Sequence, residues 1–304
     1  MATSHFVLPL PLAGNTTEQQ NRMLQEFLGE AVQKAYERAI EQLDRQAAQA
    51  VIETNGILKD EIAEAMFAAI QRHAISDKFR DEEVASERVY PTTYRVRPIE
   101  AQVTELRKVF PQLGSCHEKL ARRPLLEGAD AWFAIPRWQA IATTYNEAVE
   151  TIIDALGKRR RFSNRLIGKL DGKYLRQTER SALAESILAE QQQGCDILVV
   201  AAQAGILHRG SSARRTRVVL APNEFALGAF SFASMLLTHP ERLSSRDTLM
   251  VDCGGDEYSV RGDYTFDRVP LFDYDLGGIE FSIFYHDRAR NLWGTPTGFT
   301  YKFG

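Results

Sequence analysis

The pattern of apolar and polar positions predicts a chain that is helical in its first part and mixed further on. Between residues 17 and 51 apolar side chains recur every three or four positions, which is typical of an amphipathic helix. A second stripe of the same spacing covers residues 58–75, and Asn55-Gly56 between the two favours a helix end. Two long amphipathic helices in succession predict a helical hairpin within an N-terminal region, residues 1–80.

The pattern changes after this region. Four prolines interrupt residues 81–130, so this connector has room only for short helices such as 100–110. A mixed α/β domain is expected over residues 131–304. Its first helix carries a buried stripe from Ile141 to Leu156, and the spacing predicts another helix over 175–193.

The rest of the chain has strand-like patterns. "CDILVVAA" is almost wholly apolar and rich in β-branched residues, which predicts a strand buried on both faces, and "TRVVLA" predicts a second strand. "NEFALGAFSFASMLLTH" is apolar nearly all round and predicts a core helix. From Thr248 onward turns alternate with strands, most clearly in "GIEFSIFYH". The expected fold class is α+β, with a helical N-terminal half and a mixed α/β C-terminal half that ends rich in β-strand.

Composition fits a globular protein that stays out of the membrane. The chain has 304 residues, of which 44% are hydrophobic and 25% charged, so it can bury a large core. No window approaches the roughly 20 apolar residues of a membrane-spanning helix. The three cysteines are far apart in sequence, which argues against a disulfide framework and favours a reducing, cytoplasmic location.

Charge is unevenly distributed along the chain. The formal net charge is −3, yet residues 158–180 hold nine basic and two acidic side chains, a local charge of +7 that leaves −10 on the remainder. Arginine offers fork-like donors to phosphate oxygens, and Phe162 and Tyr174 within the segment could stack on bases. A second basic cluster follows in "HRGSSARRTR". These two clusters predict phosphate contacts by the following residues: Lys158, Arg159, Arg160, Arg161, Arg165, Lys169, Lys173, Arg176, Arg209, Arg214, Arg215 and Arg217.

A structural role for the same residues is the alternative. "KRRR" follows a predicted helix and can stabilise its C-terminal carbonyls through the macrodipole. The basic residues can equally dock against the acids of their own chain. The two interpretations differ in whether the guanidinium groups face outward together or are paired internally.

The pentapeptide "GGDEY" at residues 254–258 resembles the signature loop of diguanylate cyclases, in which glycines approach the nucleotide and acids hold a metal ion. The resemblance ends there, because no Asp lies between Asp196 and Asp247, where such a domain needs a metal ligand. The pattern favours a Gly-Gly hairpin turn that joins "TLMVDC" to "YSV".

The leading functional hypothesis is a non-catalytic nucleic-acid-binding protein that needs no cofactor or metal. One alternative is a structural or assembly protein whose residues 18–75 pair with a second copy or a partner protein. The other is a metal-dependent enzyme that acts on phosphodiesters through Asp252, Asp256 and Glu257. No nucleophile elbow, P-loop or zinc motif supports a more specific activity.

Overall fold

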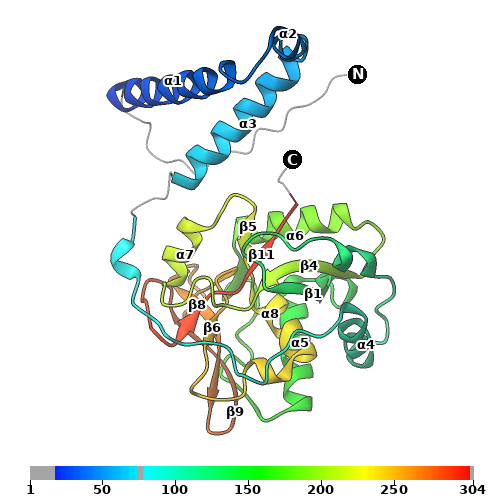
Figure 1. Ribbon diagram of the computed structural model, residues 1–304. Coiled ribbons are helices and arrows are strands. Elements are labelled where there is room, and N and C mark those ends of the chain that lie inside the picture. Colours follow the sequence, from blue (N-terminus) through cyan, green and yellow to red (C-terminus); the bar gives the residue numbers. More distant parts are fainter. Residues whose placement is uncertain (1–17, 74–77, 302–304) are drawn as a thin grey trace. The chain divides into compact units, whose positions relative to one another are not determined.

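The computed structural model describes residues 18–73 and 78–301. The chain divides into two units, Met1–Ala74 and Ile75–Gly304, and each is considered by itself. The described residues form eight α-helices and eleven strands in two sheets, so the fold is mixed α+β, as the sequence predicts (Figure 1).

The first unit contains three helices. They are α1 (Glu18–Ile40), α2 (Arg45–Glu53) and α3 (Asn55–His73). The predicted first helix is split, because the Asp44 side chain accepts a hydrogen bond from Ala47 N (2.7 Å) and caps α2. Several large apolar side chains of these helices are exposed: Phe27, Tyr36, Ile52, Ile57 and Phe67. The unit therefore has apolar surface that its own helices do not cover.

The second unit is built on two sheets. The first has strand order β1-β4-β11-β5, with every pair antiparallel. Its strands are β1 (Ala131–Pro136), β4 (Ile197–Gln203), β5 (Glu224–Ala226) and β11 (Thr297–Phe299). Every residue of β4 is buried, which confirms the strand predicted from "CDILVVAA". Helix α6 (Glu179–Gln191) packs on β4 and β5, and α4 (Ile99–Val109) and α8 (Ala229–Thr238) pack on β1 (Figure 1).

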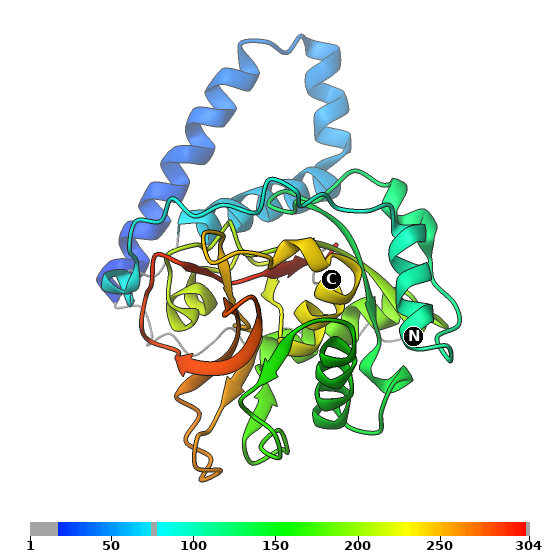
Figure 2. The same cartoon turned by 90° about the horizontal axis from the view of Figure 1, so that it is seen from below.

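The second sheet is formed mostly by the C-terminal part of the chain, so the β-rich end is confirmed. Its strands are β2 (Phe162–Asn164), β3 (Leu175–Gln177), β6 (Met250–Asp252), β7 (Asp256–Tyr258), β8 (Arg268–Asp275), β9 (Gly278–Tyr285) and β10 (Trp293–Gly294). The long β8–β9 hairpin dominates it, and β2 pairs with β9 (Figure 2).

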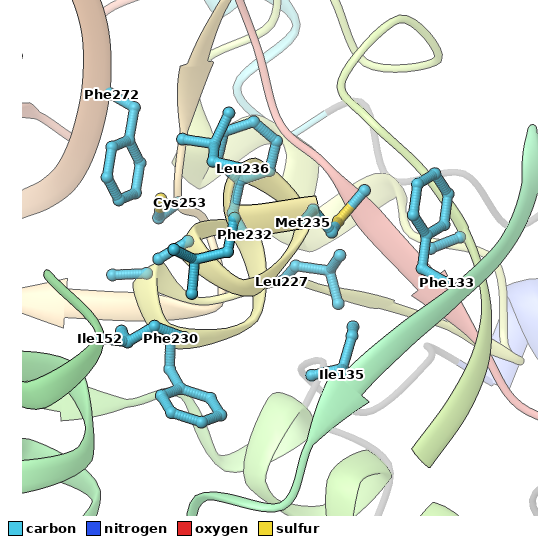
Figure 3. Close-up of a cluster of buried hydrophobic side chains, with 14 of the residues drawn as sticks. Phe133, Ile135, Ile152, Leu227, Phe230, Phe232, Met235, Leu236, Cys253 and Phe272 are labelled. Atoms are coloured by element: carbon cyan, nitrogen blue, oxygen red, sulfur yellow. The ribbon is translucent and has the colours of Figure 1, made fainter. Parts of the chain in front are cut away.

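Helix α8 lies at the centre of the core. All ten of its residues are buried, as the apolar run predicts. Phe232 contacts Phe272 of the second sheet, with ring centroids 5.6 Å apart, while Phe133 and Ile135 of the first sheet lie at the opposite side of the same helix (Figure 3). Burial of these side chains holds the two sheets together through one helix.

Helix α5 (Tyr145–Arg159) packs against α8 and confirms the predicted helix. It begins with a capping box in which Thr144 accepts from Glu147 N and Glu147 accepts from Thr144 N. The helix predicted over 175–193 begins later, at Glu179, because Leu175–Gln177 pair with β7 as β3 and the Thr178 side chain caps α6.

Candidate functional site

Seven of the twelve predicted phosphate-contacting residues are exposed, and four of the seven are already in ion pairs. Arg159 pairs with Glu105 (3.7 Å), Arg165 with Glu280 (2.9 Å) and Lys173 with Asp171 (3.6 Å). Arg176 pairs with Glu257 (2.8 Å). The exposed residues are Lys158, Arg159, Arg161, Arg165, Lys169, Lys173 and Arg176. Arg160 is only half-exposed, and its guanidinium donates to the carbonyls of Pro240 and Leu243.

The second basic cluster lies on a helix, so the strand predicted from "TRVVLA" is wrong. The Ser212 side chain caps α7 (Ala213–Val219), and this local hydrogen bond outweighs the β-branched run that follows. Arg214 and Arg215 pair with the carboxylates of Glu82 and Glu83, respectively. Arg209, which precedes α7, donates to the carbonyl of Arg88 (3.1 Å). Arg214 and Arg215 thus connect the segment that contains Glu82 and Glu83 to α7.

Arg217 of the second basic cluster and Arg176 of the first bind the same carboxylate, that of Glu257. Its guanidinium donates to the carbonyls of Gly254 (2.8 Å) and Asp256 (2.6 Å) and to Glu257 Oε1 (3.2 Å). Arg176 of the first cluster binds the other oxygen of the same Glu257 carboxylate. The clusters therefore meet with an anion between them.

Residues 254–255 form a turn, in which Asp256 N donates to Cys253 O (3.0 Å), but the predicted hairpin is wrong. β6 and β7 do not pair with each other; both lie antiparallel to β8, as two parts of one interrupted strand. Neither glycine has a positive φ. A side chain at Gly255 would instead lie 2.4 Å from the carbonyl oxygen of Ala226, so glycine is required for close backbone approach.

This interruption directs Asp256 at the first turn of α8. Gly228 is the N-cap of α8 and has no side chain to offer, and Asp256 Oδ2 accepts from Ala229 N (2.6 Å) in its place. Tyr145 donates its hydroxyl to Asp256 Oδ1 (2.8 Å). Burial raises the pKa of Asp256 to about 7, although both hydrogen bonds act in the opposite direction.

Asp252 is a second buried acid of the same segment. Burial raises its pKa to about 7, and Oδ1 has no hydrogen-bond partner among the described residues. Among the residues that the structure describes, no group of three or more His, Cys, Asp and Glu side chains is placed to hold a metal ion. Asp252, Asp256 and Glu257 are thus not gathered into the carboxylate site that a metal-dependent enzyme would need.

The histidines that carry clear contacts have structural partners. His208 Nε2 lies 2.7 Å from Glu224 Oε1, and Thr297 donates to the same oxygen (2.6 Å). His239 is buried and accepts from Arg97 N (3.0 Å), and burial lowers its pKa to about 4. His239 therefore stays neutral at physiological pH.

A pocket of about 410 Å³ lies between α6 and the first sheet. One wall is a face of α6 with small side chains such as Ala182 and Ala189, and the other is formed by apolar residues of the strands, including Leu198 and Phe225. Trp138 also lines the pocket. The size of the pocket is that of small-molecule sites.

Glu185 places a carboxyl group in the wall of this pocket. Gln177 Nε2 donates to its Oε2 (2.9 Å), and the Ser231 hydroxyl donates to its Oε1 (3.1 Å). Burial raises the pKa of Glu185 above its usual range. The buried pair Tyr145–Asp256 lies just behind, because Tyr145 contacts the pocket residues Trp138 and Phe230.

Arg137 is the cationic residue of the lining. It follows β1, and its backbone N donates to Asp196 O (2.7 Å) at the start of β4. Its Nε is buried and has no hydrogen-bond partner among the described residues. The pocket thus combines apolar side chains with two carboxyl groups, those of Glu185 and Glu190, and one guanidinium group.

No protein-family model matches this chain, and no curated protein or solved structure matches it. Over the described ranges, 18–73 and 78–301, no helix combines the length and hydropathy that crossing a membrane requires. The sequence predicted no functional role for Glu185, Arg137 or Tyr145. The one available signal was Glu185 itself, a carboxylate on the same helical face as Ala182 and Ala189.

Proposed function

We propose that the second unit binds a small organic molecule in the pocket beneath α6. The pocket falls within the roughly 300–1,000 Å³ that is typical of ligand sites. Apolar and polar side chains both line it, a combination that favours specific binding over simple packing.

Glu185 is the observation that carries the proposal. An ionised carboxylate has about four acceptor sites, and the protein fills two of them through Gln177 and Ser231. Burial raises the pKa of Glu185, because it destabilises the ionised carboxylate. A further hydrogen-bond donor to the carboxylate would stabilise the ionised form. A hydroxyl or amine of a bound molecule would supply that donor.

The test is calorimetry of the full chain with a panel of small aromatic compounds: phenethylamine, tyramine, benzyl alcohol, 3-phenylpropionate, 3-(4-hydroxyphenyl)propionate and 3-(4-hydroxyphenyl)propionamide. Ala189→Trp fills the pocket from α6, and Leu183→Trp adds the same side chain to an exposed position of α6 outside the lining. Binding should persist in Leu183→Trp and disappear in Ala189→Trp. Binding that survives Ala189→Trp, or no binding by any compound, would refute the proposal.

Nucleic-acid binding is a second proposal, supported by the seven exposed cations between residues 158 and 176. Exposed ion pairs contribute only about 0–1 kcal/mol, so a polyanion can compete for the paired arginines. Fluorescence anisotropy with a single-stranded 20-mer across a salt series tests it. Lys158→Glu with Lys169→Glu should weaken binding and flatten the salt dependence, and the control pair Lys34→Glu with Lys59→Glu should not. Affinity that does not change with salt would exclude this role.

For the first unit, we propose association with a second copy of the chain through α1–α3. The support is the exposed apolar surface of these helices, with Phe27 68% exposed and Ile57 65% exposed. Such surface commonly becomes buried in a protein interface.

A further inference from the structure

Arg137 restricts the chemistry of the molecule that the pocket can take. Among the described residues, the Arg137 side chain makes no hydrogen bond or ion pair. Its Nε is closed off from solvent, so a bound molecule would meet the two terminal nitrogens of the guanidinium, which are left without an acceptor. A carboxylate is the acceptor that fits best, since its hydrogen bonds with arginine are charge-assisted. The acids of the lining, Glu185 and Glu190, form no ion pair with Arg137.

The two polar groups lie toward different ends of the pocket. Glu185 is held by Ser231 at the start of α8 and by Gln177 of β3. Arg137 lies beside Asp196, just beyond the end of α6, where Gln193 and Gly194 line the pocket. Glu185 lies six residues before Gln191, the last residue of α6, and at 1.5 Å per helical residue this puts the two ends on the order of 10 Å apart.

The space between these ends is apolar and aromatic. Leu198 and Val200 of β4, Phe225 of β5 and the Trp138 ring form its sides. An aromatic ring fits such walls better than a flexible polar chain does, because it buries a large area at little cost in conformational entropy.

We infer that the pocket recognises a small aromatic acid whose carboxylate meets Arg137 and whose hydroxyl or amine, at the far end of the ring, meets Glu185. This inference rests on the proposed ligand-binding function and adds the polarity and orientation of the ligand. It also explains why one pocket holds a guanidinium and a carboxyl group that do not bind each other.

Three probes of nearly equal shape test the inference by calorimetry on the full-length wild-type chain. They are 3-(4-hydroxyphenyl)propionate, its amide 3-(4-hydroxyphenyl)propionamide and the deoxy acid 3-phenylpropionate. The hydroxy acid should bind at least about tenfold more tightly than either analogue, the difference expected for one lost charge-assisted hydrogen bond. An amide that binds as well as the acid would overturn the inference.

Two substitutions test which end of the ligand Arg137 binds and which end Glu185 binds. Arg137→Gln should remove the preference for acid over amide and keep the preference for hydroxyl over hydrogen, and Glu185→Gln should do the reverse. Equal effects of both variants on both preferences would contradict the orientation. If phenethylamine or benzyl alcohol binds the wild type in the pocket while the three acid-series probes do not, the inference fails and the binding function stands. If no compound of the panel binds, the binding function itself fails.

Discussion

The hydroxyl of Tyr145 offers a direct test of the buried acid behind the pocket. Tyr145→Phe removes the donor to Asp256 Oδ1 (2.8 Å) and leaves the ring, which contacts Trp138 and Phe230, in place. Among the described residues, the Asp256 carboxylate then keeps a single hydrogen bond, from Ala229 N. The substitution therefore isolates one interaction of the capping carboxylate.

The expected cost depends on pH. Since the pKa of Asp256 is about 7, the carboxyl group is mainly ionised at pH 8 and mainly neutral at pH 5. A hydrogen bond to an ionised group contributes about 1.5–3 kcal/mol, and one between neutral groups about 0.5–1.5 kcal/mol. Tyr145→Phe should thus lower the free energy of unfolding by roughly 1 kcal/mol more at pH 8 than at pH 5.

Urea unfolding followed by tryptophan fluorescence measures this difference. The three tryptophans of the chain, at positions 132, 138 and 293, all lie in the second unit, so the signal reports that unit alone. Tyr264→Phe is the control, because Tyr264 is 71% exposed and its loss should cost almost nothing at either pH. An equal cost of Tyr145→Phe at pH 5 and pH 8 would refute the role given to ionised Asp256.

Three further predictions concern the fold and the first unit. The pKa of Asp252 is raised from 3.8 to about 7, so the folded state keeps a proton that the unfolded state releases, and this residue lowers stability by up to about 1.4 kcal/mol per pH unit between those values. Asp256, whose pKa is raised likewise, adds a slope of its own. In urea titrations at pH 5, 6 and 7, Asp252→Asn should therefore reduce the wild-type slope by the Asp252 contribution, and an unchanged slope would contradict this prediction. Gly255→Ala should destabilise by about 2 kcal/mol or more through its clash with backbone, whereas Gly172→Ala, which meets nothing within 4 Å, should stay within about 0.5 kcal/mol in the same assay. Light scattering should give the full chain a mass above the 34.3 kDa of one copy and a chain lacking residues 1–74 the mass of a monomer, and a monomeric full chain would exclude self-association.

The elements that the sequence predicted well are those whose burial is uniform along the chain. β4 and α8 are apolar at almost every position, and no arrangement of neighbours could have exposed them. The helical spacing of apolar residues was sufficient to predict α5, and their period-two alternation was sufficient to predict β9.

The failures come from interactions that apolar patterning does not record. The Ser212 hydroxyl accepts a hydrogen bond from Arg215 N and caps α7, which favours a helix although the segment is rich in β-branched residues. At residue 255, the requirement for glycine comes from the backbone of Ala226 and Gly228, some 30 residues earlier in the chain. Neither cause lies in the strand and turn signals of the segment itself.

The pocket could not be predicted from the sequence for the same reason. Arg137, Gln177, Glu185, Phe225 and Ser231 come from separate elements, and only the packing of α6 on the sheet brings them to one space. The basic clusters were visible as composition. Their partners, such as Glu105, Glu280 and Glu257, are distant in sequence, so composition could not show that the charges are paired.

Because α8 is the helix that both sheets share, neither sheet has a complete interior without it. The second unit should accordingly lose its structure in one step, with no stable fragment in which a single sheet survives. For expression or crystallisation, a cut is better placed ahead of residue 75 than anywhere between the sheets. A destabilising substitution in α8 should therefore disturb the packing of both the pocket and the β8–β9 hairpin.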